Sequence, residues 1–243
     1  MNFESRRPVL GPAICVEIPI VSVVDGDRTT REALEVLILA AGWRPKMAAS
    51  AEEFLAAPRI TTPGCLLADL QLPGLSGLDL QSRVADRAER PIVFMSATVD
   101  VPATVQAMKA GALDVLIKPI DGSVLVNALR EAVERSYAIR RQQAHAKALQ
   151  ERYEALSRRE REVLWLVTSG RLNKQAGGEL GISEITVKAH RGRMMRKMQA
   201  SSVAELVTMA TRLRTCIPDE QPAWAGRYTR ATPESFVSQL RSA

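Results

Sequence analysis

Four polar residues that lie far apart in the chain each stand at the end of a short apolar run. In chain order they are Asp25, Asp69, Ser96 and Lys118. Apolar runs of this length, bounded by turn residues, are typical of strands buried on both faces of a parallel sheet. The carboxyl ends of such strands open on one edge, where open α/β folds place their chemistry. We therefore expect the four side chains to converge.

Together these groups suit phosphoryl transfer. Asp69 is a candidate nucleophile toward a phosphoryl donor, which would yield an aspartyl phosphate. Asp25 and Asp69 can hold Mg²⁺, which neutralises an incoming phosphoryl group. Ser96 can hydrogen-bond the phosphoryl group, and Lys118 can pair with it as a point charge. Asp69 alone could equally cap the turn that begins at Pro73; the joint placement of the four residues favours the chemical interpretation.

The elements that position these residues alternate between strand and helix five times. This pattern predicts a doubly wound, flavodoxin-like (βα)5 parallel sheet with helices on both faces. The expected strands are residues 18–24, 43–48, 65–69, 92–96 and 113–117. The expected helices run from a cap at Thr29 or Thr30 to Ala41, from Ser50, over 77–88 and 102–111, and from a cap at Ser123.

Charge divides the 243-residue chain. Residues 1–140 carry 15 Lys and Arg against 17 Asp and Glu, whereas residues 141–217 carry 15 against 7. A near-neutral half followed by a basic segment predicts a sensing module joined to a nucleic-acid module. Apolar runs stay well short of the ~20 residues of a membrane span. Three scattered cysteines fit a reducing compartment, so we expect a cytoplasmic protein that makes no membrane contact.

The basic half has the pattern of an all-α domain of four helices with a helix-turn-helix at about residues 171–190. Ser157 to Glu160 forms a capping box, Asn173 can cap a short helix, and Gly181 precedes the N-cap Ser183. Ile185, Val187 and Met194 are expected to face the core. The expected DNA contacts are Lys174, Thr186, Lys188, Ala189, His190, Arg191, Arg193 and Arg196.

The domain boundaries follow from these patterns. We expect an N-terminal arm at 1–17, the α/β domain at 18–138, a helical linker at 139–155, the helix-turn-helix domain at 156–214 and an extension at 215–243. The linker is polar nearly all round. It could be a solvated spacer, or it could pair with a second copy through loosely heptad-spaced apolar residues.

The first half resembles the receiver domain of two-component response regulators, and residues 100–112 resemble the FixJ branch in particular. The resemblance implies that Asp69 is the phosphoacceptor, which a sensor histidine kinase would phosphorylate, and that the Lys118–Pro119 bond is cis. It further implies Mg²⁺ ligands at Asp25, Asp69 and the backbone carbonyl of Gln71, and switch residues at Ser96, Lys118 and Val115.

Two departures from the receiver pattern concern the metal and the switch. Receivers usually carry a second acid directly after the first, but Gly26 stands there, and Asp27 lies one residue further. The usual aromatic switch residue is Val115, whose burial involves less area. One hypothesis is therefore that Mg²⁺ binding and phosphorylation are weakened or lost. The alternative is that Asp27 or water substitutes and the domain works normally.

The second half is similar to the LuxR-type helix-turn-helix over about residues 153–214, through the stretches 156–164, 173–175 and 180–191. Receiver and LuxR-type domain together give the NarL/FixJ architecture. The family has alanines where this chain has Gly177 and Gly178. Glycine inside a helix costs about 1 kcal/mol relative to alanine, which predicts a soft scaffold helix. The resemblance also implies a homodimer.

These expectations combine into a transcriptional response regulator that is not an enzyme. Its partners would be double-stranded DNA, a sensor histidine kinase and RNA polymerase. The alternative is a pseudo-receiver controlled without phosphorylation, by protein contact, a ligand or a redox signal. An enzyme is disfavoured because the second half lacks a Gly-rich phosphate loop, a metal triad and a nucleophile–base set.

Overall fold

The computed structural model describes residues 17–216, which form two compact units that divide after Arg141. The expected arm at 1–17, apart from Glu17, lies outside the described residues. So does the expected extension at 215–243, apart from its first two residues.

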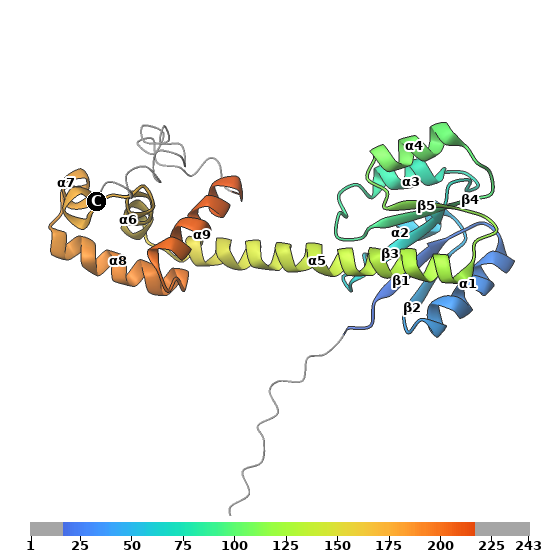
Figure 1. Ribbon diagram of the computed structural model, residues 1–243, viewed down its shortest axis with the longest axis horizontal. Coiled ribbons are helices and arrows are strands. Elements are labelled where there is room, and N and C mark those ends of the chain that lie inside the picture. Colours follow the sequence, from blue (N-terminus) through green and yellow to red (C-terminus); the bar gives the residue numbers. More distant parts are fainter. Residues whose placement is uncertain (1–16, 217–243) are drawn as a thin grey trace, which may run out of the picture. The chain divides into compact units, whose positions relative to one another are not determined.

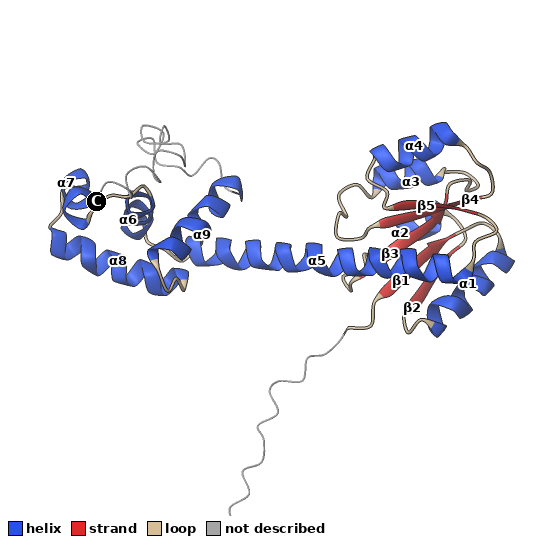
Figure 2. Ribbon diagram, viewed as in Figure 1, coloured by secondary structure: helices blue, strands red, loops and turns tan. Residues whose placement is uncertain are grey.

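The first unit contains a five-stranded sheet in which every neighbouring pair is parallel, in the order β2-β1-β3-β4-β5 (Figure 2). This confirms the predicted parallel α/β fold. β2 is added on one side of β1, and β3, β4 and β5 follow on the other side. β1 and β3 therefore lie next to each other although β2 separates them in the sequence. The strands are β1 (Ile20–Val24), β2 (Arg44–Ala48), β3 (Gly64–Asp69), β4 (Ile92–Ser96) and β5 (Asp114–Ile117).

Helices cover both faces of this sheet (Figure 1). One apolar cluster joins the strands to α1 and α5 through Leu34, Ile38 and Leu129, and the other joins them to α2, α3 and α4 through Phe54 and Leu80. Alternate residues of each strand serve the two clusters because side chains alternate along a strand. The helices are α1 (Arg28–Ala40), α2 (Ala51–Ala56), α3 (Gly77–Arg83), α4 (Val101–Lys109) and α5 (Gly122–Glu154).

In the first unit, two predicted helix caps were wrong. Asp27, and neither Thr29 nor Thr30, caps α1, because its carboxylate accepts hydrogen bonds from the backbone N–H groups of both threonines. Asp121 does the same at the start of α5, where it accepts from the N–H of Ser123 at 2.7 Å. In both places a carboxylate stood two residues before the hydroxyl, and a carboxylate is the stronger acceptor at a helix N-terminus.

Helix α3 is shorter than the predicted span of 77–88. It ends at Arg83, and residues 84–90 form successive turns. The turns bring the guanidinium of Arg90 beneath the sheet, where it donates to the carbonyl oxygens of Ile20, Cys65 and Thr62. A longer helix would carry Arg90 away from these carbonyl oxygens.

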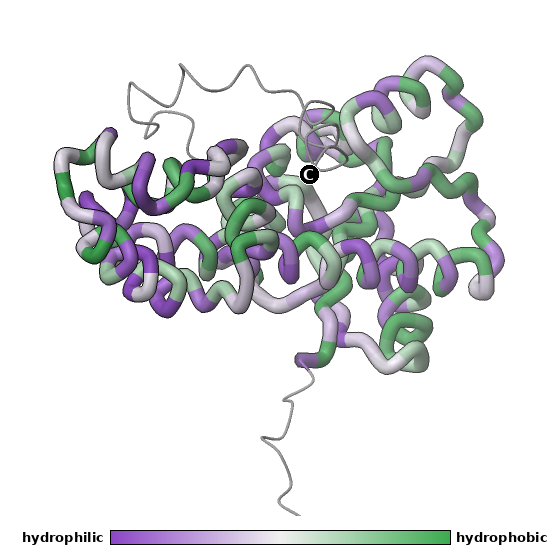
Figure 3. The backbone as a smooth tube through the Cα atoms, turned by 60° about the vertical axis from the view of Figure 1, so that its left-hand side comes forward, coloured by the Kyte–Doolittle hydropathy of each residue, from purple (hydrophilic) through white to green (hydrophobic). Residues whose placement is uncertain are grey.

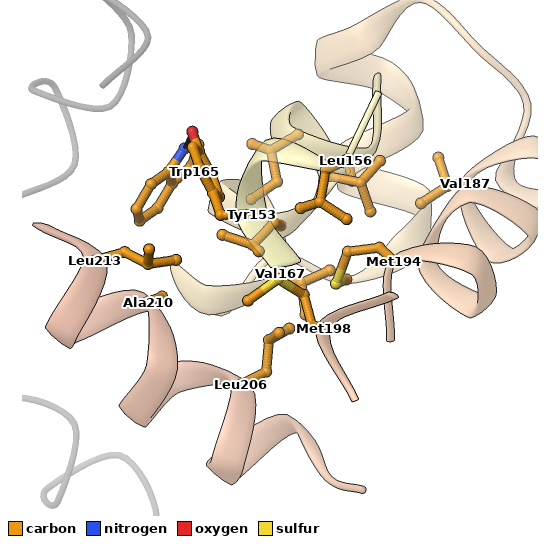
Figure 4. Packing of buried hydrophobic residues seen from close by; sticks show 14 of the residues in the cluster. Tyr153, Leu156, Trp165, Val167, Val187, Met194, Met198, Leu206, Ala210 and Leu213 are labelled. Carbon is orange, nitrogen blue, oxygen red and sulfur yellow. Dashed lines mark hydrogen bonds between the residues drawn. The ribbon is translucent and has the colours of Figure 1, made fainter. Parts of the chain in front are cut away.

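Over its described residues, 142–216, the second unit is all-α, as predicted, and consists of four helices and the last turns of α5. Tyr153, at the end of α5, contacts Trp165 edge-to-face with the ring centroids 6.1 Å apart. Figure 4 shows these rings beside Leu213, with Met198 and Leu206 packed on the other side of Val167. The helices are α6 (Arg158–Thr168), α7 (Asn173–Leu180), α8 (Glu184–Met198) and α9 (Val203–Cys216).

Helices α7 and α8 form the predicted helix-turn-helix. Gly181 ends α7 in the left-handed conformation, and Ser183 caps α8 by accepting from the N–H of Thr186. The predicted cap of α7 was wrong: Leu172 holds that position, and the side chain of Gln175 accepts from its N–H at 2.9 Å. The side chain of Asn173 instead accepts from Arg191.

The predicted burial of α8 was correct for Val187 and Met194, both fully buried, but wrong for Ile185, which is 79% exposed. Residues two apart on a helix point about 200° away from each other. Ile185 and Val187 therefore cannot share one face, and the core selects Val187.

Hydrophilic and hydrophobic residues are interspersed along the helices (Figure 3). Accordingly, no helix within residues 17–216 is both long and apolar enough to cross a membrane.

The two glycines of α7 differ in their surroundings. A Cβ on Gly177 would lie 2.7 Å from the carbonyl oxygen of Ile182, because the chain folds back closely after the turn. Gly177 itself accepts from the N–H of Ile182 at this point. A Cβ on exposed Gly178 would meet nothing within 4 Å. The first glycine therefore permits a close approach, whereas the second only weakens the helix.

We predict opposite effects of alanine at these two positions. Gly178→Ala should stabilise α7 by about 0.5–1 kcal/mol, because it reduces the flexibility of the unfolded chain. Gly177→Ala should destabilise it by about 1–2 kcal/mol through overpacking. Hydrogen exchange of the amides across 174–180 measures both. The wild-type α7 should exchange faster than α8, and equal protection of the two helices would contradict the soft-helix expectation.

Candidate acceptor site and nucleic-acid interface

Two carboxylates meet at the carboxyl edge of the sheet. Val24 and Ala68 pair in register on β1 and β3, so Asp25 and Asp69 are neighbours at the next position. Their side chains are nearly buried, with residue exposures of 1% and 7%. One oxygen of Asp25 accepts the N–H of Asp27 at 2.8 Å, and one oxygen of Asp69 accepts the N–H of Gln71 at 2.7 Å. The second oxygen of each carboxylate remains to be paired.

Lys118 supplies the pairing charge. Its Nζ lies 2.7 Å from Oδ2 of Asp25 and 2.6 Å from Oδ2 of Asp69, so a single ammonium bridges the two acids. Burial acts to lower the pKa of Lys118, but hydrogen bonds with Asp25 and Asp69 outweigh it and hold the pKa above its ordinary value. Two carboxylates this close repel each other unless a cation lies between them.

Ser96 lies at the end of β4, and its backbone carbonyl accepts the N–H of Lys118 at 2.8 Å. The residue is 2% exposed, and its hydroxyl donates to the carbonyl oxygen of Thr98. The side-chain amide of Gln71 donates to the hydroxyl of Thr98 at 3.0 Å. The loops after β3 and β4 are thereby joined over the carboxylates.

The structure brings together Asp25, Asp69, Ser96 and Lys118 but leaves two other candidates apart from them. Val115 is half-buried and packs against the cluster beneath α2, α3 and α4. The carboxylate of Asp27 is engaged by Thr30, whose hydroxyl donates to it at 2.6 Å. The cis Lys118–Pro119 bond is present, as expected.

Sequence reasoning missed two contributors to this site. Arg31, in the first turns of α1, donates to the carbonyl oxygens of Asp25 at 2.7 Å and Gly26 at 3.1 Å. Thr98 receives the hydrogen bonds of both Ser96 and Gln71. A hydroxyl two residues after a strand-end serine was a usable signal for Thr98. Nothing in the sequence distinguished Arg31 from a solvated helix arginine.

Mg²⁺ commonly uses one or two carboxylates, keeps several waters and requires octahedral geometry. Asp25 and Asp69 supply carboxylate oxygens of the kind that Mg²⁺ uses, whereas Gly26 contributes no side-chain donor. Within residues 17–216 no group of three His, Cys, Asp or Glu side chains could hold a metal ion. The set suits a weakly held ion that competes with Lys118 for carboxylate oxygens.

In the second unit, the core fixes the rotation of α8. Val187, Met194 and Met198 are fully buried and point inward. A helix turns about 100° per residue, so the opposite side carries Ile185, Ala189, Gly192 and Arg196. All four of these residues are exposed. Lys188 and Arg193 flank this line and are also exposed.

The eight candidate DNA contacts divide by their environment. Within residues 17–216, Lys174, Arg193 and Arg196 are exposed and form no ion pair. Lys188 is exposed and pairs with Glu184 at 3.1 Å. The others are Ala189, which is exposed, Thr186, which bonds Ser183, Arg191, which bonds Asn173, and His190, whose buried Nδ1 has no hydrogen-bond partner within the described residues.

Lys197, also on α8, has a structural contact instead. Its Nζ lies 2.6 Å from Oε2 of Glu160, a carboxylate only 4% exposed, and donates to the carbonyl oxygen of Ala155. Burial acts to raise the pKa of Glu160, but the hydrogen bonds from Lys197 and Ser157 and the charge of Lys197 together outweigh it, and the pKa is lowered. The cation thus joins the end of α8 to the capping box of α6.

Comparison with known families identifies both halves. Residues 21–130 match the family described as response regulator receiver domain, and residues 154–210 match the family described as bacterial regulatory proteins, luxR family.

Individual relatives share both halves. The response regulator protein TmoT of Ectopseudomonas mendocina is 41% identical over 196 residues, which cover 80% of this chain and 89% of TmoT. The transcriptional regulatory protein FixJ of Azorhizobium caulinodans is 39% identical over 191 residues, covering 78% and 90%. A solved structure of the response regulator StyR is similar with a TM-score of 0.74 at 38% identity, covering 80% of this chain and 99% of that chain.

The charge balance at the acceptor edge predicts a specific pH dependence. Lys118→Met should destabilise the first unit by about 1–3 kcal/mol at neutral pH, because it leaves two facing carboxylates without a cation. The pKa of Lys118 is raised by folding. Its contribution is therefore fully present below the ordinary lysine pKa of about 10.4 and is lost as the pH rises through the higher folded value.

Urea unfolding of wild type and Lys118→Met tests this. The stability difference should be constant from about pH 7 to about pH 9 and should shrink above about pH 10.4. Exposed Lys109 on α4 offers a matched control, since Lys109→Met should change stability little at any pH. A difference that stayed constant as the pH rose well above the ordinary lysine pKa, or no difference at neutral pH, would contradict the assigned pairing.

The unpaired arginines of α8 predict a salt effect. Arg193→Ala and Arg196→Ala should each weaken DNA binding and reduce the slope of log affinity against log salt by about 0.9 per lost phosphate contact. Arg158→Ala is the control, since the side chain of Arg158 is 93% exposed but lies on α6, where it pairs with Glu162 of the same helix. A gel-shift titration measures the slopes, and unchanged slopes in both α8 variants would contradict the assignment.

Proposed function

Because this chain belongs to the NarL/FixJ family of response regulators, which join a receiver domain to a LuxR-type DNA-binding domain, we propose that phosphorylation of Asp69 controls its binding to DNA. The observation that supports this most strongly is the convergence of Asp25, Asp69 and Lys118, whose side-chain atoms lie within 2.7 Å although 93 and 49 residues separate the lysine from the two acids.

The proposed reaction transfers a phosphoryl group from a histidine of a sensor kinase. One carboxylate oxygen of Asp69 attacks phosphorus, an O–P bond forms, and the P–N bond to the imidazole breaks. The imidazole leaves with the electron pair. The attacking oxygen is Oδ2, since Oδ1 is engaged by the N–H of Gln71. Lys118 already contacts Oδ2 and would then pair with a phosphoryl oxygen.

Mg²⁺ would be held by Asp25, Asp69 and the backbone carbonyl of Gln71, and would neutralise charge on the transferred group. Gly26 removes one ligand, and Asp27 is engaged at the cap of α1. We therefore propose that this chain needs more Mg²⁺ than a receiver with two adjacent acids. Ser96 would report the phosphoryl group by exchanging its hydrogen bond to Thr98 for one to phosphate.

On the DNA side, α8 would lie in the major groove. Lys174, Lys188, Arg191, Arg193 and Arg196 would bind phosphates or base edges, and Thr186, Ala189 and His190 would complete the contact surface. Arg191 would also be oriented by Asn173.

The remaining assignments extend the same proposal. The functional domains would be 18–138 and 156–214, with 139–155 as the linker inside α5, which runs unbroken from Gly122 to Glu154. The protein would act in the cytoplasm as a homodimer together with RNA polymerase. It would regulate transcription rather than catalyse a metabolic reaction.

A second candidate function is control without phosphorylation. Gly26 and the engaged Asp27 support it, since both reduce metal binding. A redox version gains no support from Cys65: it is fully buried, and burial raises the pKa of its thiol to about 12, whereas reactive cysteines have lowered pKa values.

Binding of beryllofluoride, a phosphoryl mimic, tests the two candidates. We predict that the wild type binds it only with Mg²⁺, and that Gly26→Asp lowers the Mg²⁺ requirement at least about tenfold, the equivalent of about 1.4 kcal/mol. A Cβ at position 26 would lie 3.2 Å from the ring of Pro73, so a small ring shift admits it.

Two control variants distinguish an effect on the acceptor site from an effect on the fold. Asp69→Asn should abolish beryllofluoride binding, whereas Asp114→Asn, an exposed acid at the start of β5, should leave it unchanged. Beryllofluoride should also raise the affinity of the wild type for DNA. If the wild type bound no mimic at any Mg²⁺ concentration, and Gly26→Asp restored binding, control without phosphorylation would be the correct function.

A further inference from the structure

Ile185 is the second residue of α8 and the most exposed of the large hydrophobic side chains in the described part of the chain, at 79%. Exposing a large apolar side chain forfeits about 1.5–3 kcal/mol of burial energy. The core does not require it there, since Val187 and Met194 anchor the helix. We propose that Ile185 is a sequence-reading residue that contacts the C5-methyl group of a thymine in the major groove.

Position supports this role. The N-terminal residues of a recognition helix are the ones that contact base edges. Ile185 points about 160° away from Val187, which is buried in the core. The side chain therefore stands on the outermost line of α8.

The neighbours on this line define the chemistry. Ala189 follows one turn later, and Gly192 one turn after that; both are exposed, and a Cβ on Gly192 would meet nothing within 4 Å. The first half of the outer line thus offers alkyl groups and no hydrogen-bond donor. In the major groove the only apolar group on a base edge is the thymine methyl.

The surrounding charges favour DNA over a protein as the occupant. Lys188 and Arg193 flank the line, and Arg196 continues it toward the end of the helix. A short apolar surface bordered by cations complements thymine methyl groups bordered by phosphates. Lys188, Arg193 and Arg196 are all cations, which suits the phosphates on either side of the major groove.

The inference rests on DNA binding by this domain and adds which base it reads. The full chain is first used to select binding sites from random duplex DNA. Each thymine of the selected site is then replaced singly by deoxyuridine, which lacks only the C5-methyl group. Affinities are measured for the wild type and for Ile185→Ala.

At one thymine in each half-site, deoxyuridine should weaken wild-type binding about fourfold, which is the value of one buried methyl group. Ile185→Ala should bind the unmodified site about fourfold or more weakly and should show no further loss with deoxyuridine at that position. Sites selected by Ile185→Ala should lose their thymine preference there. Val36→Ala on α1, which removes another exposed β-branched side chain (67% exposed), should behave as the wild type.

Three results would overturn the proposal. Equal deoxyuridine effects in the wild type and Ile185→Ala would show that another residue reads the methyl group. Unchanged DNA affinity in Ile185→Ala would assign the exposed side chain to a different partner. If the full chain selected no duplex, DNA binding itself would fail, and the inference with it.

Discussion

One ammonium group between two buried carboxylates is the constraint on which the first unit depends. Asp25 and Asp69 are adjacent because the strand order places β1 beside β3. Their charges are tolerable only because Lys118 lies within 2.7 Å of both. The backbone of Lys118 is in turn fixed by a hydrogen bond to Ser96. A group that binds one of these acids must therefore displace or recruit the lysine.

The second unit depends on a different constraint, the rotation of one helix. Val187, Met194 and Met198 hold α8 against the core, and Lys197 joins its end to Glu160 at 2.6 Å. These contacts leave an outward line that is apolar at its start and cationic at its end. The turn after α7 folds back so closely on this helix that a Cβ on Gly177 would lie 2.7 Å from the carbonyl oxygen of Ile182. The packing of the unit thus determines which side chains can reach a base.

Much of this could be predicted from the sequence, for a physical reason. Buried parallel strands leave apolar runs, and their carboxyl ends share an edge, so the convergence of Asp25, Asp69 and Lys118 follows from the pattern of runs. The competition between neighbouring side chains to cap a helix was harder to predict. Asp27 displaced two threonines as the cap of α1, and this engaged the one acid that could have replaced Gly26. The exposure of Ile185 depended on which of two apolar residues the core selects, a choice that only three-dimensional packing makes.

The proposed control of DNA binding by α8 begins with phosphorylation of Asp69. The most direct test treats wild type and Asp69→Asn with a small phosphoryl donor and Mg²⁺, locates any aspartyl phosphate by mass spectrometry, and measures DNA affinity in the same samples. The predicted result is a single modified residue, Asp69, in the wild type, together with tighter DNA binding that Asp69→Asn lacks. Equal DNA affinity with and without phosphate on Asp69 would contradict the link, and modification of another residue would contradict the site.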